Sequence, residues 1–227
     1  EIVDIAGLVK GASKGEGLGN KFLANIRNTN AIIHVLRCFE NDNITHVDGS
    51  IDPVRDKGII DTELQLKDLE TIENRLAKTQ KQAVVGGDKQ AKRAVEILLQ
   101  YKAVLEQGLS ARTVELEKED RKLVADLNLL TDKPVLYVCN VDEKSAVTGN
   151  EHTRAVEAAI ADERAEMLIV AAATEADIAE LDEYEERQMF LEEIGLKESG
   201  VARLIKAAYK LLDLQTFFTT GADESRA

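Results

Sequence analysis

The sequence is poor in residues that break helices, bind metals or cross membranes. Only two of its 227 residues are proline, and none is tryptophan. Scarce proline with abundant alanine, leucine, glutamate and lysine favours helix. No run of about 18 apolar residues occurs, which excludes a transmembrane helix. Residues 1–4 lack the basic start and long apolar stretch of a signal peptide. We therefore expect a cytoplasmic protein without membrane contact.

Cysteine is equally scarce. Cys38 and Cys139 each follow an apolar, strand-like run, so we expect two buried thiols in a reducing compartment. So few ligands do not indicate a metal site built from protein side chains.

The chain also lacks an excess of positive charge, since its formal net charge is −13. This excludes a uniformly basic nucleic-acid binder and favours solubility. One segment differs: residues 75–93 contain six cations and one anion, a net charge of +5. Its cations are Arg75, Lys78, Lys81, Lys89, Lys92 and Arg93. Such a segment can bind RNA or another polyanion, and the alternative is a solvated helix face.

Strand-like and helical segments alternate along the chain, which predicts an α/β fold with a mostly parallel sheet. We expect strands at residues 1–5, 31–37, 134–139, 167–171 and 214–218. We expect a polar loop at 38–58 and helices at 18–28, 60–84, 89–107, 117–130, 151–163, 181–194 and 199–212.

Two of these segments carry apolar stripes at spacings of three and four residues. The stripes are Leu69, Ile72, Leu76, Thr79 and Ala83, then Ala91, Val95, Leu98, Lys102 and Leu105. Joined by a short glycine turn, they predict an antiparallel helical hairpin of coiled-coil type, inserted between two strands. The expected domains are 1–58 and 131–220 for one nucleotide-binding domain in two segments, 59–130 for the hairpin, and 221–227 for a linker.

The first apolar run is followed by Asp4 and by a segment that contains five glycines. Asp4 and the first of these glycines form the pattern Asp4-x-x-Gly7. In nucleotide switch proteins such an aspartate reaches Mg²⁺ through water, and the glycine N–H turns toward the γ-phosphate. We therefore interpret Asp4 as a metal-site residue and Gly7 as a phosphate sensor. The alternative is an ordinary glycine-rich loop.

A second pattern, Asn140-x-x-Glu143, follows the strand expected at 134–139. Guanine-specific switch proteins carry Asn-Lys-x-Asp here, so Val141 replaces the lysine and Glu143 the aspartate. The longer acid intrudes where the guanine amine would lie, which predicts relaxed specificity or a preference for ATP over GTP. A one-residue shift of the loop would instead bring Asp142 to the base. A third base loop is expected at Ala171, Ala172 and Ala173, where a backbone N–H can meet the purine.

Together, residues 4–20, 37–43, 140–143 and 211–217 resemble the YchF family of Obg-like ATPases. The resemblance covers nearly the whole chain and implies a P-loop NTPase fold with a helical insertion. It also implies Mg²⁺ with ATP or GTP as cofactor, and the ribosome or ribosomal RNA as partner. We expect a monomer.

Two expected parts of the family are missing. The phosphate-binding loop Gly-x-x-x-x-Gly-Lys-Ser/Thr does not occur in the sequence, and neither does the C-terminal TGS domain. The chain has no initiator methionine and begins as if within a strand, so we expect a fragment. Hydrolysis is assigned to the parent protein, and this chain alone is expected to bind nucleotide poorly and not to hydrolyse it.

The residue after Gly7 is Leu8, which cannot orient an attacking water as the glutamine of Ras-like proteins does. His46, in a loop after the second strand, is our candidate for that catalytic role, and the resemblance supports a histidine there. The alternative for His46 is a surface loop residue.

A different function remains open, an RNA- or ribosome-binding module that uses the basic hairpin, with nucleotide only as a conformational clamp. The third possible function is that of a scaffold whose nucleotide site is inert.

Overall fold

The computed structural model describes residues 1–5, 18–44, 49–85, 88–163, 165–217, 219–220 and 225–226. These residues form two compact units, and each is described by itself. Unit 1 comprises Glu1–Ile32, Asp52–Pro134 and Ala155–Arg164, and unit 2 comprises Ile33–Ile51, Val135–Arg154 and Ala165–Ala227.

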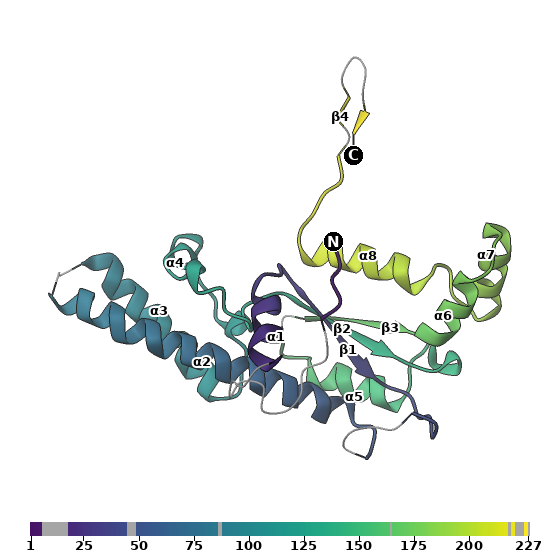
Figure 1. The fold of residues 1–227 in the computed structure, drawn as a ribbon, viewed down its shortest axis with the longest axis horizontal. Helices are drawn as coiled ribbons and strands as arrows, with labels where there is room; N and C mark the ends of the chain where they lie inside the picture. Colours follow the sequence, from purple (N-terminus) through teal and green to yellow (C-terminus); the bar gives the residue numbers. More distant parts are fainter. Residues whose placement is uncertain are drawn as a thin grey trace. The chain divides into compact units, whose positions relative to one another are not determined.

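The sheet has three strands in the order β1-β2-β3 (Figure 1). They are β1 (Ile32–Arg37), β2 (Val135–Asn140) and β3 (Ala165–Val170). β2 pairs in parallel with β3 and places Asn140 opposite Val170. The bonds between β1 and β2 advance together along both strands, from Ile32 N to Pro134 O and from Cys38 N to Asn140 O, so this pair is parallel too. The predicted α/β class is confirmed.

The strand predicted at residues 1–5 is wrong. These residues carry no strand and join no ladder among the described residues, and an apolar run becomes a strand only when a neighbour pairs with it. The strand predicted at 214–218 is also absent over residues 214–217. A short antiparallel pair follows instead, β4 (Thr219–Thr220) and β5 (Ser225–Arg226).

Unit 1 is built on an antiparallel hairpin of α2 (Pro53–Val85) and α3 (Lys89–Glu106) (Figure 1). Its core contains the stripe residues Ile72, Leu76, Leu98 and Leu105. Thr79 is buried within the same stripe and donates its hydroxyl to Arg75 O at 2.9 Å, so a polar side chain is accommodated there. The predicted pair of helices between two strands is therefore present.

α2 begins earlier than the start expected at about residue 60. Proline is favoured at the first helical position, and Pro53 occupies it. Asp52 precedes it and accepts a hydrogen bond from Arg55 N at 2.9 Å, as an N-cap does. The polar loop predicted at 38–58 therefore ends before Pro53.

The helix predicted at 117–130 is broken. The segment contains η2 (Ala111–Thr113), α4 (Lys118–Lys122) and η3 (Ala125–Leu127). Asn128 adopts a φ of 47°, which ends helical geometry, and the following Leu129 and Leu130 turn into the cores. α1 (Leu18–Arg27) packs Leu23 and Ile26 against Leu130.

The remaining helices follow β2 and β3 along the chain. They are η4 (Glu143–Ser145), α5 (Glu151–Ala159), α6 (Ala172–Ala179), α7 (Tyr184–Glu193) and α8 (Gly200–Leu211). α8 packs against β2 and β3. α6 was not predicted, because its alanine-rich start was interpreted as a base loop.

Candidate nucleotide-binding edge

Two of the predicted base loops meet at the carboxyl ends of β2 and β3, the edge where ligands bind in open parallel sheets. Asn140 ends β2, and its side-chain Oδ1 accepts a hydrogen bond from Ala172 N at 3.1 Å. Ala172 is the first residue of α6, which follows directly on β3. This hydrogen bond brings Asn140 and the segment at Ala171, Ala172 and Ala173 together at one edge of the sheet.

The loop after Asn140 is fixed by its own side chains. Val141 is only 3% exposed and donates its N–H to Val170 O at 2.9 Å, so its side chain is buried. Asp142 accepts a hydrogen bond from Ser145 N at 3.1 Å and caps η4. Glu143 is exposed. Both carboxylates are exposed, but Asp142 uses one oxygen to cap η4.

Asn150 braces this loop, a role that the sequence analysis missed. Its Nδ2 donates to Cys38 O at 2.7 Å, and its Oδ1 accepts from Thr153 N at 3.1 Å. Gly149, with φ 68°, lets the chain turn, since a Cβ there would lie 2.3 Å from Thr153 Oγ1. The pattern Asn150-x-x-Thr153 is typical of a helix cap and was the available signal.

The two cysteines lie at the carboxyl ends of neighbouring strands, Cys38 directly after β1 and Cys139 near the end of β2. Cys38 and Cys139 are both fully buried and unbridged, as predicted. The Cys38 thiol donates a hydrogen bond to the Cys139 sulfur, and this bond with burial raises the pKa of Cys38. His34 is half-buried, and its ring centroid lies 5.6 Å from that of Tyr137. His152 is also half-buried, with Nε2 3.5 Å from Glu40 Oε1.

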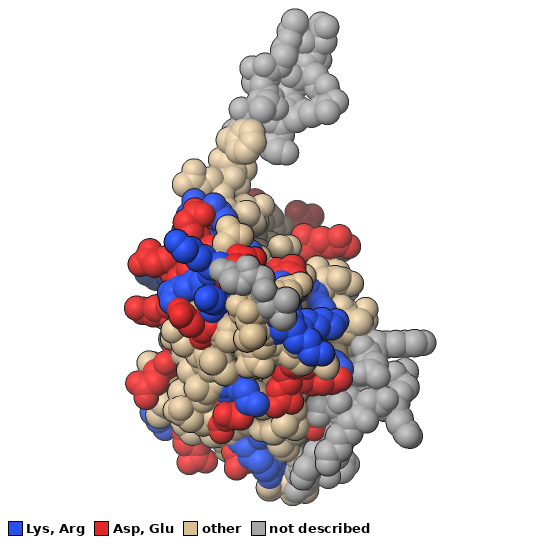
Figure 2. All heavy atoms as spheres, turned by 90° about the vertical axis from the view of Figure 1, so that its left-hand side faces the viewer, with Lys and Arg blue, Asp and Glu red and all other residues tan. Residues whose placement is uncertain are grey.

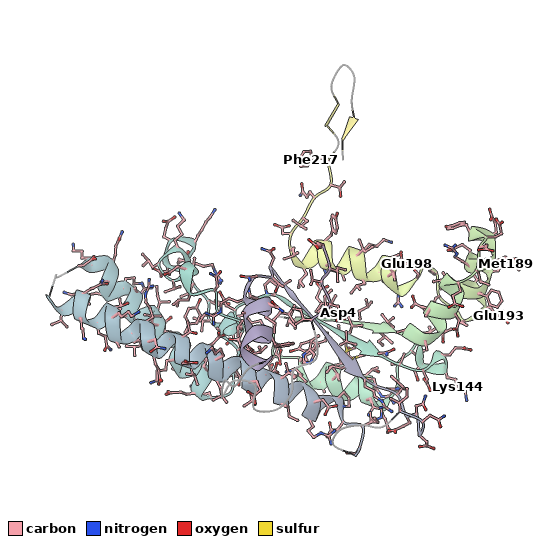
Figure 3. The ribbon with its side chains drawn as sticks, viewed as in Figure 1. Asp4, Lys144, Met189, Glu193, Glu198 and Phe217 are labelled. Atoms are coloured by element: carbon pink, nitrogen blue, oxygen red, sulfur yellow. The ribbon has the colours of Figure 1, made fainter. Side chains whose placement is uncertain are left out.

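The residues predicted to contact the metal and the phosphates belong to another part of the chain. Asp4 is an exposed residue of unit 1 (Figure 3). Gly7, Leu8 and His46 lie outside the described residues. No group of three or more metal-ligating side chains gathers within the described ranges.

The predicted basic surface lies along the end of the hairpin. Lys78, Lys81, Lys89 and Lys92 are exposed. Arg93 is engaged in ion pairs with Glu96 at 2.7 Å and Asp120 at 2.6 Å, and these carboxylates raise its pKa. Figure 2 shows basic and acidic atoms interspersed on the face at this end. Of these five cations, the four lysines are exposed, and Arg93 is exposed but ion-paired. Of the helices that the structure describes, none has both the length and the apolarity needed to cross a bilayer.

Comparison with known proteins identifies relatives over the whole chain. No protein-family model matches. The chain is 52% identical over 229 residues to a Bacillus subtilis protein named ribosome-binding ATPase YchF. It is 51% identical over 227 residues to the protein of the same name from Escherichia coli O157:H7. Both alignments cover 100% of this chain and 62% of the relative.

The structure of the Schizosaccharomyces pombe YchF GTPase superposes with a TM-score of 0.82 at 32% identity. That match covers 98% of this chain and 60% of the yeast chain, so the chain spans about three fifths of the length of its relatives. The predicted P-loop NTPase fold and the predicted membership of the YchF family of Obg-like ATPases are thereby confirmed.

Proposed function

We propose that the chain supplies the base-recognition loops, the switch segment and the helical hairpin of a ribosome-associated ATPase. The observation that carries the proposal is the hydrogen bond between Asn140 Oδ1 and Ala172 N, 3.1 Å long. It ties the loop that begins at Asn140 to the loop at 171–173 at one edge of the sheet. A single purine can therefore contact both. The names of the relatives support ATP and the ribosome as ligand and partner.

ATP is the favoured nucleotide, with GTP accepted less well. Asp142 Oδ1 caps η4, which holds that carboxylate in the loop and favours Glu143 as the acid beside the base. Glu143 is exposed, and its longer side chain takes the space of the guanine amine. Adenine has no amine at C2, so it escapes this conflict.

Mg²⁺ would accompany the nucleotide. Mg²⁺ keeps several waters and binds one or two carboxylates together with substrate phosphates, and the exposed carboxylate of Asp4 fits that use. The ion supplies charge neutralisation at the phosphates. The Gly7 N–H would sense the γ-phosphate, and His46 would position water for in-line attack. Positioning and electrostatics supply most of the acceleration in such reactions.

The test is a titration of labelled ATP and GTP into a form of the protein as long as its YchF relatives. We expect tighter binding of ATP, and Glu143→Asp should shift the preference toward GTP. Glu157→Asp, at an exposed position of α5, is the matched control and should change neither affinity. Equal affinities for the two nucleotides, unaffected by Glu143→Asp, would contradict the proposal. The present chain, which lacks the phosphate-binding loop motif, should bind weakly and not hydrolyse.

A second function, polyanion binding by the hairpin, is favoured by the exposed Lys78, Lys81, Lys89 and Lys92. Changing all four to glutamine should weaken RNA or ribosome binding. It should also reduce the slope of log affinity against log salt by up to about four. The control changes four exposed lysines elsewhere, Lys118, Lys144, Lys197 and Lys206. If both sets have equal effects, the hairpin end is only a solvated surface.

A further inference from the structure

A buried carboxylate links the candidate base loop to the last long helix. Glu175 lies in the first turn of α6, the same turn that holds the proposed base-contacting residues Ala172 and Ala173, and it is only 9% exposed. Its Oε2 accepts a short hydrogen bond from Gly200 N. Gly200 is the first residue of α8. The side chain therefore connects α6 with the start of α8.

The start of α8 is shaped to receive this carboxylate. Ser199 caps the helix by accepting a hydrogen bond from Ala202 N at 3.2 Å, which leaves the Gly200 N–H for Glu175. A Cβ at position 200 would lie 2.5 Å from Glu175 Oε1 and 2.8 Å from Oε2, so a larger residue there would displace the carboxylate from this position. The positive end of the helix dipole also favours a carboxylate here.

Some polar atoms at this contact have no hydrogen-bond partner. Glu175 Oε1 has no hydrogen-bond partner, and neither do Nε and Nη2 of Arg203 on α8. Arg203 Nη2 lies 3.6 Å from Oε1, which makes an ion pair but is too long for a hydrogen bond. Native structures leave few buried polar atoms unpaired. Three such atoms lie at this one contact between α6 and α8.

Two attachments fix the beginning of α6. Asn140 accepts the Ala172 N–H on the side of the sheet, and Glu175 attaches the same turn to α8. The backbone N–H of Glu175 also closes this turn, donating to Ala171 O at 3.0 Å. Loss of the Glu175 carboxylate would therefore free the loop at 171–173 on one side.

We propose that Glu175 is a positioning residue for the nucleotide base, holding the loop at 171–173 in place through its attachment to Gly200. The inference rests on the proposed function, because it takes this loop as the place where the purine binds. Glu175 itself does not touch the nucleotide.

The first experiment needs no nucleotide. Amide hydrogen exchange is measured in this chain for residues 172–175 in Glu175→Ala, Glu175→Gln and Gly200→Ala. We expect exchange about tenfold faster in Glu175→Ala and Gly200→Ala, with Glu175→Gln restoring part of the protection. The amides of β2 report global opening and should exchange at the unaltered rate. Unchanged exchange at 172–175 in both Glu175→Ala and Gly200→Ala would overturn the inference.

The matched control is Glu198→Ala. Glu198 also lies at the start of α8 (Figure 3), but it pairs with exposed Lys206. Its removal should leave exchange at 172–175 unchanged. An effect equal to that of Glu175→Ala would show a general weakening of α8 and contradict a specific role for Glu175.

The second experiment uses the protein at the length of its YchF relatives. Glu175→Ala should raise KM for ATP about tenfold with kcat unchanged, because uniform binding is lost, and Glu175→Gln should recover most of it. Faster exchange with an unchanged KM would overturn the positioning of the base. If the unaltered protein neither binds nor turns over ATP, the proposed function fails, while the exchange experiment still decides whether Glu175 anchors the loop.

Discussion

Two buried carboxylates, Asp68 in the hairpin unit and Glu175 at the base edge, join neighbouring elements in different ways. Asp68 is fully buried, and its Oδ1 accepts from Leu130 N at 2.8 Å. Its Oδ2 accepts from the N–H and the hydroxyl of Thr131, both at 2.7 Å. Glu175 has one hydrogen bond, and its other oxygen has none.

The difference separates a structural contact from a positioning contact. A buried polar network with all partners present rigidifies a fold, whereas an unpaired buried atom carries a cost. Asp68 attaches α2 to the segment at 130–131 and lies within unit 1. Glu175 lies beside the loop that we assign to the base. We therefore expect substitution of Asp68 to lower the free energy of unfolding more than substitution of Glu175 does. Substitution of Glu175 should have the larger effect on hydrogen exchange at residues 172–175.

The largest expected effect concerns the hydrophobic core of the hairpin and leaves both carboxylates unchanged. It sets the scale of stability against which the two carboxylates are compared. Leu98 is fully buried in the hairpin core, and its neighbour Leu99 is 48% exposed. Leu98→Ala should lower the free energy of unfolding by about 3–4 kcal/mol through lost burial and a cavity. Leu99→Ala should cost less than about 1 kcal/mol. Urea unfolding measures both, and equal costs would contradict the assigned core.

The next effect compares the carboxylates directly. Asp68→Ala leaves two buried N–H groups and a hydroxyl without their acceptor, so we expect a loss of about 2–3 kcal/mol in the free energy of unfolding. Glu175→Ala removes a single hydrogen bond and should cost about 1 kcal/mol. The same urea experiment ranks them. A larger cost for Glu175→Ala would reverse the comparison and make Glu175 the structural residue.

The smallest effect is a pH dependence. Burial raises the pKa of Asp68 above its usual 3.8, although hydrogen bonds from Thr131 and Leu130 oppose the shift. The folded state therefore binds this proton more tightly than the unfolded state does. The stability contribution is present below the usual pKa and is lost as the pH rises through the raised folded pKa. Asp68→Asn does not titrate and should flatten this part of the profile. An identical slope in Asp68→Asn would show that another group is responsible.

Local sequence patterns predicted the parts of the fold that depend on neighbouring residues. The stripe from Leu69 to Ala83 identified the buried face of α2, because helical periodicity is a local property. The pattern Asn140-x-x-Glu143 placed one base loop at the end of a strand. The signal for the start of α2 was present in Asp52-Pro53, but it was interpreted as a turn.

Contacts between distant residues could not be predicted in the same way. Nothing near Glu175 in the sequence indicates that Gly200 will donate to it, since the contact exists only once α6 and α8 have packed. The strand predicted at residues 1–5 was wrong for a related reason, because pairing decides a strand and apolar character alone does not. Asn150 had a local signal in its cap, but its bond to Cys38 depends on the folded sheet.

The length of α2 has a mechanical consequence. A single helix of 33 residues extends about 50 Å at 1.5 Å per residue. Rotating such a rod by about 5° where it leaves Pro53 sweeps its far end through about 4 Å. A small rotation near the first turn of α2 therefore produces a much larger displacement at Val84. A partner bound at that end of the hairpin would be moved by this displacement.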